Sequence, residues 1–286
     1  MNTIIDAKGI HKSYGAKVAL DHINLQIPEG KIVGLIGPNG AGKTTLLKGI
    51  LGLATVEGSL RVMGLNPFTD RVKLLEDVSF IADTAILPRW LKVSEAIEYI
   101  EGVHPKFSRE KALGFLAKTN ICMSSKVQSL SKGMVTQLHL ALIMAIDSKL
   151  LVLDEPTLGL DIVYRKQFYE ALLNDYYDAQ KTIIITTHQV EEIEGILTDL
   201  LFINDGKIVL ETSMEEISEK FYELHVDSAN KDAALALQPI NVRTILGGFI
   251  MVFENANLAQ LEALGKVGTP SVADLFVAKM QTIKSV

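Results

Sequence analysis

The sequence predicts an α/β fold with a mostly parallel core sheet, and two observations carry this prediction. Short apolar runs at 31–37, 150–154 and 182–187 are typical of strands that are buried on both faces of a parallel sheet. Stretches with apolar residues at helical spacing alternate with these runs, which places helices on the faces of the sheet.

The first 30 residues favour strands, because apolar and polar residues partly alternate in NTIIDAKGIHKSY and VALDHINLQIPEG and both stretches end at turn residues. The strand at 31–37 enters a glycine-rich turn, and a helix is expected over 43–53. Further short strands are expected at 59–64 and 78–82.

Residues 92–146 interrupt the alternation of strands and helices, since three successive stretches in this block have apolar residues at helical spacing. We interpret the block as a helical insertion that forms a subdomain over about 85–146. Further helices are expected at 163–180 and 189–199, on either side of the strand at 182–187.

After about residue 210 the pattern changes, which predicts a small α+β appendage over 211–286 beside a larger domain over 1–210. Strands are expected at 221–228 and 242–254, the second folded into a hairpin at Gly247-Gly248. Helical spacing is present at 232–237, 257–265 and 271–281.

The composition predicts a cytoplasmic protein. The one cysteine, Cys122, cannot form a disulfide within the chain, which fits a reducing compartment. We expect Cys122 to lie in the core. The stretch MNTIIDAKGI does not have the pattern of a signal peptide. Apolar runs such as ALIMAI fall far short of the roughly 20 residues that cross a bilayer. A net charge of −6 without a basic cluster argues against a nucleic-acid partner.

The stretch GPNGAGKTT (37–45) fits the phosphate-loop pattern G-x-x-x-x-G-K-[ST], and it joins an apolar strand to a helix as that motif requires. Its glycines allow backbone N–H groups to surround a β-phosphate, Lys43 suits the β- and γ-phosphates, and the Thr44 hydroxyl suits Mg²⁺. A glycine-rich turn without a ligand is the disfavoured alternative, because the motif and its context agree.

Two acids follow the strand in LLVLDEP (150–156). Asp154 ends the strand, where ligands bind in open α/β sheets, and it is the expected second metal ligand. Glu155 is the natural general base for a water molecule. Solvated acids at a strand end would be the better interpretation if the phosphate loop were absent.

A second element, LSKGMVTQ (130–137), predicts a helix start that attracts anions. Ser131 suits a helix N-cap, and Gly133 leaves the first turn uncovered. The free N–H groups and the helix dipole there both favour a phosphate. One chain therefore carries two predicted phosphate-binding elements about ninety residues apart.

The order and spacing of GPNGAGKTT, LSKGM, LVLDEP, TLGLD and TTH resemble those of the nucleotide-binding subunits of ABC transporters, over roughly residues 3–210. The resemblance implies a P-loop NTPase of the ABC-ATPase fold, with an antiparallel N-terminal β subdomain and a helical insertion. In that family the phosphate loop of one subunit faces the Ser-Gly helix start of a second subunit, with ATP between them. The two elements of one chain would then serve two different ATP molecules.

The resemblance also implies further residue roles. Tyr14 matches the aromatic residue that stacks on adenine; the alternative is a tyrosine that only packs on the surface. Asp161 matches an acid that communicates across the dimer. His188 matches the residue that contacts the γ-phosphate and the attacking water, with a polar strand end as the alternative, so Glu155 and His188 are the expected catalytic pair. The expected ATP-binding residues are Tyr14, Gly37, Pro38, Asn39, Gly40, Ala41, Gly42, Lys43, Thr44, Thr45, Ser131, Lys132, Gly133 and Asp161.

The chain departs from the family pattern at three positions. Lys132 and Met134 stand where relatives often have Gly and Gln, although the backbone amides remain. Where the family has a metal-contacting Gln, this chain offers Asp83, or alternatively Thr84. Asp83 is predicted as a metal ligand together with Thr44 and Asp154, with a simple loop acid as the alternative.

Trp90 and Leu91 lie on the surface that, in the family, receives the membrane partner, with a buried tryptophan as the alternative. The implied function is that of an ATP-hydrolysing subunit, with ATP and Mg²⁺ as cofactors. It would act as a homodimer or with a related subunit, peripheral on the inner face of the membrane, and drive a separate permease that exports its substrate. The alternatives are a soluble ATPase acting on nucleic acid or the ribosome, and a nucleotide-sensing regulatory subunit.

Overall fold

The computed structural model describes residues 2–81 and 87–284, and it describes side chains up to residue 280. Its central sheet has six strands in the order β5-β6-β7-β3-β8-β9, parallel except for the β8–β9 pair. All residues of β3, β6 and β7 are buried, as the apolar runs predicted. The strands are β3 Ile32–Ile36, β5 Val78–Ile81, β6 Leu150–Asp154, β7 Thr182–Thr186, β8 Asp199–Asn204 and β9 Lys207–Ser213.

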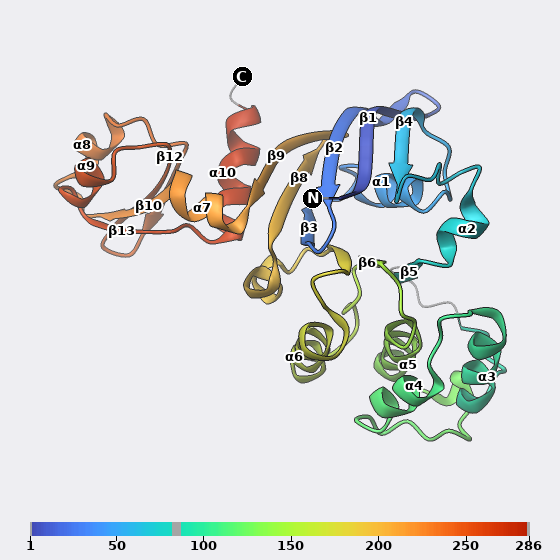
Figure 1. The fold of residues 1–286 in the computed structure, drawn as a ribbon. Helices are drawn as coiled ribbons and strands as arrows, with labels where there is room; N and C mark the ends of the chain where they lie inside the picture. The colour runs from blue at the N-terminus through green and yellow to red at the C-terminus, as the bar shows by residue number, and fades with distance from the viewer. Residues whose placement is uncertain (1, 82–86, 285–286) are drawn as a thin grey trace.

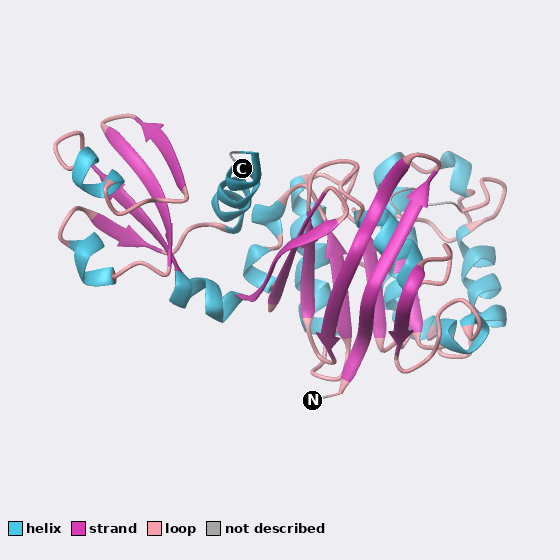
Figure 2. Ribbon diagram, turned by 90° about the horizontal axis from the view of Figure 1, so that it is seen from above, coloured by secondary structure: helices cyan, strands magenta, loops and turns pink. Residues whose placement is uncertain are grey.

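A three-stranded antiparallel sheet covers one side of the core. Its order is β2-β1-β4, from β1 Thr3–Tyr14, β2 Lys17–Pro28 and β4 Glu57–Val62. Helix α1, Lys43–Ile50, packs between this sheet and the central one, since Leu46 and Leu47 share one core with residues of both sheets (Figures 1 and 2). This arrangement confirms the antiparallel N-terminal subdomain.

The predicted helical insertion is confirmed. It consists of α3 Val93–Val103, α4 Arg109–Leu116 and α5 Lys132–Met144, with a 3₁₀ turn at Val127–Ser129, and the short α2 Arg71–Leu75 precedes β5. These helices have a core of their own, which includes Ile97, Leu116 and Leu142. The opposite side of α5 contributes Leu140 and Met144 to the core of the central sheet, so α5 joins the insertion to the sheet (Figure 1).

Two predicted helices differ from the structure. Helix α6, Ile162–Ala171, gives way to a π-helical turn at Leu172–Tyr176, so the α-helix is shorter than 163–180. The prediction of a helix at 189–199 was wrong, because two 3₁₀ turns, Val190–Glu192 and Glu194–Ile196, occupy that segment. A 3₁₀ helix has three residues per turn, so it too buries Val190 and Ile193, the spacing that suggested an α-helix.

The C-terminal segment forms a second antiparallel sheet in the order β11-β12-β10-β13, with its own core around Leu224, Met251 and Phe253. Ile245 pairs with Gly248, so the hairpin turn is Leu246-Gly247, one residue earlier than expected, with Gly247 at a φ of 87°. The strands are β10 Phe221–Val226, β11 Asn241–Ile245, β12 Gly248–Glu254 and β13 Lys266–Gly268, and the helices are α7 Met214–Lys220, α8 Lys231–Leu235, α9 Leu258–Glu262 and α10 Val272–Lys284.

Helix α10 returns toward the central sheet and lies between it and the C-terminal sheet (Figure 1). Val272 and Leu275 are fully buried in the core that also contains Phe202, and the Val272 N–H donates to the Glu194 carboxylate at 3.2 Å. Ile217 and Phe221, at the start of the C-terminal segment, belong to the same core, so the segment is anchored at both of its ends. The division of the chain at residue 210 stays a prediction.

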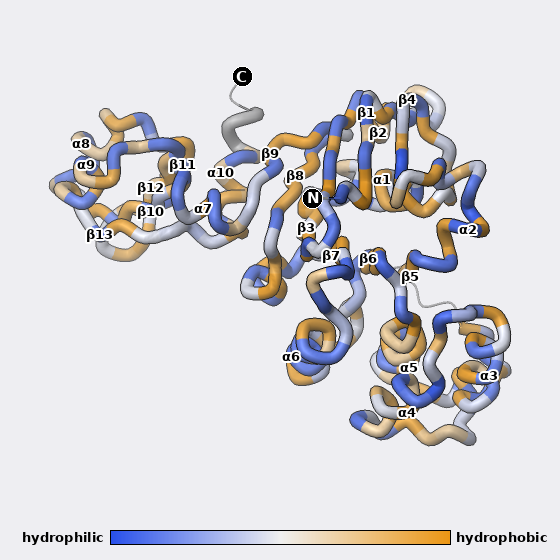
Figure 3. Tube along the Cα trace, viewed as in Figure 1, coloured by the Kyte–Doolittle hydropathy of each residue, from blue (hydrophilic) through white to orange (hydrophobic). Residues whose placement is uncertain are grey.

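Hydrophobic and hydrophilic residues are interspersed along the trace (Figure 3). Within residues 2–81 and 87–284, no helix has both the length and the apolar character needed to cross a bilayer. Cys122 is exposed rather than in the core, which corrects the expectation for this residue.

Candidate nucleotide-binding site

The phosphate loop lies between β3 and the start of α1, as the motif predicted. Gly40 and Gly42 adopt φ values of 83° and 114°, which disfavour residues with a side chain. A Cβ atom on Gly37 would lie 2.3 Å from the carbonyl oxygen of Ile203. The sequence pattern therefore reflects the backbone path, because glycine is required where the loop turns and where it passes β8.

Lys43 is the first residue of α1, and its side chain folds back along the loop. Its ammonium donates to the carbonyl oxygens of Gly37 at 2.6 Å and Pro38 at 3.3 Å. Burial lowers the pKa of Lys43, and the nearby charges of Glu155 and Asp154 act against that shift. Contact with a phosphate anion stabilises a poorly hydrated cation of this kind.

Asp154 and Thr44 meet at the carboxyl end of β6. The Asp154 carboxylate accepts hydrogen bonds from the hydroxyl of Thr44 at 3.0 Å and from that of Thr186 at 2.5 Å, and it is almost fully buried. A hydroxyl and a carboxylate oxygen in contact form a donor set that fits Mg²⁺, which prefers oxygen ligands.

Glu155 and His188 form a hydrogen-bonded pair beside Asp154, with His188 Nδ1 at 2.8 Å from a Glu155 carboxylate oxygen. Glu155 has a φ of 51°, an unusual conformation for a residue with a side chain. Thr186 stabilises it, because its carbonyl and hydroxyl oxygens accept from the Glu155 N–H at 3.1 and 3.2 Å. Such backbone conformations are concentrated at functional sites.

Thr186 contacts both acids, and it was not predicted from the sequence. Thr186 ends β7 and lies in register with Asp154, so its hydroxyl reaches Asp154 from the neighbouring strand. A signal was present, since two threonines follow the apolar residues 183–185 in TIIITT. Their role depended on β6 and β7 being neighbours, which the sequence pattern did not specify.

A pocket of about 300 Å³ brings together most of the predicted residues of the loop, both acids and Tyr14 from the end of β1. Tyr14 is half-exposed at its rim, and the Lys12 ammonium lies 5.3 Å from the centre of its ring. Lys17 and Ala19, which sequence analysis did not single out, also contribute. The lining residues are Tyr14, Lys17, Ala19, Pro38, Asn39, Gly40, Gly42, Lys43, Thr44, Thr45, Asp154 and Glu155.

The second predicted phosphate element lies elsewhere in the chain. Ser131 caps α5 by accepting from the Met134 N–H at 3.2 Å, and the side chain of Lys132 lies over Gly159. Asp161 caps α6 by accepting from two backbone N–H groups. Six described residues that were predicted to bind nucleotide do not line the pocket of the phosphate loop. Gly37 and Ala41 belong to the loop itself, whereas Ser131, Lys132, Gly133 and Asp161 lie outside it.

The predictions for Asp83 and Trp90 have different outcomes. Asp83 and its alternative Thr84 lie outside the described residues, so the third metal ligand stays a prediction. Trp90 is 69 % exposed, so the alternative of a buried tryptophan was wrong.

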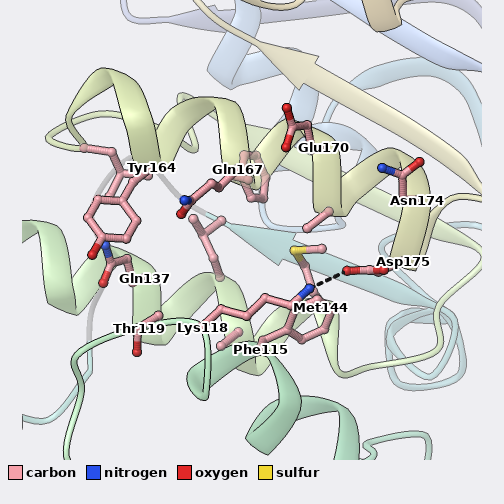
Figure 4. Close-up of a pocket in the computed structure, with 15 residues that line it drawn as sticks. Phe115, Lys118, Thr119, Gln137, Met144, Tyr164, Gln167, Glu170, Asn174 and Asp175 are labelled. Carbon is pink, nitrogen blue, oxygen red and sulfur yellow. Dashed lines mark hydrogen bonds and ion pairs between the residues drawn. The ribbon is translucent and has the colours of Figure 1, made fainter.

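A second pocket, of about 420 Å³, lies where α4 and α5 of the insertion approach α6 (Figure 4). Phe115, Met144 and Phe168 are among its lining residues, and an ion pair of 3.0 Å joins Lys118 to Asp175 at its edge. None of the described residues predicted to bind nucleotide or metal lines it. Although larger than the pocket of the phosphate loop, it contains neither the glycine loop with Lys43 nor the two acids Asp154 and Glu155.

A mostly parallel α/β sheet whose strand β3 enters a glycine loop, with a lysine and a strand-end aspartate beside that loop, defines a P-loop NTPase. The family model described as "ABC transporter" matches residues 20–158. A model described as "AAA domain, putative AbiEii toxin, Type IV TA system" matches residues 126–194.

Similar proteins specify the family. Nod factor export ATP-binding protein I of Cupriavidus metallidurans is 34 % identical over 76 % of this chain and 73 % of that protein. Lantibiotic transport ATP-binding protein SrtF of Streptococcus pyogenes is 32 % identical over 77 % of this chain and 95 % of that protein. Bacitracin transport ATP-binding protein BcrA of Bacillus licheniformis is 28 % identical over 98 % of this chain and 94 % of that protein. The chain belongs to the ABC transporter family of ATP-binding proteins.

Solved structures confirm the fold. The structure of an ATP-binding subunit of an ABC transporter matches with a TM-score of 0.69 at 22 % identity, over 76 % of this chain and 92 % of that one. A dimeric ATP-binding cassette in a post-hydrolysis state, bound to ADP and Pi, matches with a TM-score of 0.63 at 22 % identity, over 73 % and 98 %.

Proposed function

We propose that this protein is the ATP-hydrolysing subunit of an ABC transporter, which dimerises around two ATP molecules and drives a separate membrane permease. One observation carries the proposal. The chain holds a pocket with the groups that triphosphate chemistry requires, and it also presents a second anion-binding helix start outside that pocket. A second subunit, identical or related, supplies the anion-binding helix start that each pocket does not contain.

Nucleotide binding begins at the phosphate loop. The loop amides and Lys43 hold the β- and γ-phosphates, and Tyr14 stacks on the adenine at the rim. The Thr44 hydroxyl and the Asp154 carboxylate would hold Mg²⁺, which supplies positive charge to the phosphate oxygens. Asp83 remains proposed as a further ligand.

Hydrolysis uses the pair next to these groups. Glu155 accepts a proton from the attacking water, and its backbone is held by Thr186. His188, hydrogen-bonded to Glu155 at 2.8 Å and more than half exposed, contacts the γ-phosphate and the water in this proposal. The two side chains therefore act on the same water from adjacent strand ends.

Dimerisation closes the site. The N–H groups at the start of α5, near Ser131 and Gly133 of the second subunit, cap the γ-phosphate, with Lys132 adding positive charge. ATP thus stabilises the dimer, and hydrolysis removes the phosphate that the partner contacts. Asp161, at the start of α6, transmits this change between subunits.

The names of the relatives support a proposed direction of transport. Two similar proteins are named for Nod factor export, although a sulfate/thiosulfate import protein is also similar at 32 % identity. We propose export, with the subunit on the cytoplasmic face of the membrane and held there by its permease. Exposed Trp90 is the proposed anchor of that contact.

Purification in mild detergent tests the partner. We expect a membrane protein to co-purify with the tagged wild-type chain, and Trp90→Ala to weaken the complex by about 30-fold, since such anchors contribute about 2 kcal/mol. Leu246→Ala is the matched control, because Leu246 is a fully exposed apolar residue of the C-terminal segment. Recovery of ribosomes or DNA in place of a membrane protein would contradict the proposal.

A further inference from the structure

Three potential metal ligands meet on the antiparallel N-terminal sheet, outside the lining of the nucleotide pocket. His11 on β1 and Asp21 and His22 on β2 each offer one ligand atom, and these atoms all lie within 4.8 Å of one another. In the described part of the chain, this is the one group of three or more His, Cys, Asp or Glu side chains so arranged. None of the three lines the nucleotide pocket.

The sheet brings them together through a β-bulge. Ile10 pairs with Ile23 and Lys12 pairs with Leu20, so Asp21 and His22 both lie opposite His11. His22 adopts a φ of 51°, which is uncommon for a residue with a side chain. Bulges redirect side chains and are often found next to functional sites.

Neighbouring groups fix the position of the bulge and of its rings. The Asp21 N–H donates to the carbonyl oxygen of Gly206 at 2.8 Å, in the turn between β8 and β9. His22 Nδ1 is 2.8 Å from the Asp21 carboxylate, and the two imidazole rings have their centres 5.0 Å apart. The three side chains are therefore held close before any ligand arrives.

One ring nitrogen of His11 has no hydrogen-bond partner among the described residues. Its Nε2 lies 3.1 Å from the Ser13 hydroxyl, whereas its Nδ1 is shielded from solvent and has no hydrogen-bond partner. With Nε2–H donating to Ser13, Nδ1 carries a free lone pair. A buried polar atom without a partner is costly, and a metal ion would satisfy it. Metal-binding histidines are commonly oriented in this way by a hydrogen bond from their other nitrogen.

We propose that His11, Asp21 and His22 form a binding site for a divalent transition metal ion of the Zn²⁺ class. Two imidazoles and one carboxylate suit Zn²⁺, whereas Mg²⁺ prefers oxygen ligands throughout. Three protein ligands leave a coordination position for water.

Lys207 is the neighbouring positive charge. Its ammonium lies 3.2 Å from the second Asp21 oxygen, and its side chain is 63 % exposed. Exposed ion pairs contribute only about 0–1 kcal/mol, so Lys207 can turn into solvent at little cost when a metal ion binds.

Calorimetric titration of Zn²⁺ into the chelator-treated full-length chain tests the site, with excess Mg²⁺ present to occupy the phosphate-loop site. We expect one saturable Zn²⁺ per chain. His11→Ala and His22→Asn should each weaken binding at least tenfold, since even the loss of a supporting residue costs about 10- to 100-fold. Asparagine is chosen because it tolerates the positive φ of His22.

Two histidine controls separate this site from others. His225→Ala removes an exposed histidine that pairs with Glu223, and His188→Ala removes the one beside Glu155, so both should bind Zn²⁺ as the wild type does. Added Zn²⁺ should raise the melting temperature of the wild type but not of His11→Ala, which also shows that the variant is folded. Absence of saturable binding to the wild type, unchanged binding by His11→Ala and His22→Asn, or loss of binding in His188→Ala would overturn the proposal.

Discussion

A Glu155→Gln variant is expected to hydrolyse ATP about 10²- to 10⁴-fold more slowly than the wild type, because an amide cannot accept the proton of the attacking water. The change preserves shape, and the backbone contacts of residue 155 with Thr186 do not involve its side chain. Lys43 and the loop are untouched, so ATP binding should persist. The variant should therefore accumulate as an ATP-bound dimer.

Gel filtration with and without Mg-ATP measures this accumulation. Wild-type protein should return to monomer as ATP is consumed, whereas Glu155→Gln should remain dimeric. Glu191→Gln is the matched control, because Glu191 is an exposed acid close to His188 in sequence, and it should behave as the wild type does. A Glu155→Gln protein that stays monomeric at saturating ATP counts against the shared site.

Lys43→Ala should weaken ATP binding by about 10- to 150-fold, since hydrogen bonds to charged groups contribute about 1.5–3 kcal/mol. The structure adds a specific reason for a large effect. Burial lowers the pKa of Lys43, so its charge is poorly solvated and its contact with phosphate is strong.

Equilibrium dialysis with ATP measures the affinity, and the ATP-induced rise in melting temperature gives a second readout. Lys48→Ala is the control, because Lys48 is an exposed lysine in the last turn of the same helix. Equal affinities for the wild type and Lys43→Ala would contradict the assignment of the phosphate loop.

Local patterns predicted the parts of the fold that depend on local chemistry. The buried strands β3, β6 and β7 follow from their apolar runs, and the phosphate loop follows from the motif glycines Gly37 and Gly42, the second of which has a φ of 114°. The start of α5 was also predictable, because Ser131 is a preferred capping residue and does cap the helix.

Features that depend on neighbours in space could not be predicted in this way. Thr186 contacts Asp154 only because β6 and β7 are adjacent and in register. The bulge at Asp21 and His22 results from the pairing of β1 with β2, and β13 is a three-residue strand defined by its pairing with β10. Helix spacing at 189–199 was ambiguous, because 3₁₀ turns bury the same residues.

We propose that each ATP molecule is shared by two chains, held by the Lys43 loop of one and covered by the Ser131 helix start of the other. The most direct test is a structure of Glu155→Gln with Mg-ATP. We expect residues 131–133 of one protomer to contact the triphosphate that its partner's loop binds. Residues 131–133 far from every triphosphate, in all copies, would contradict it.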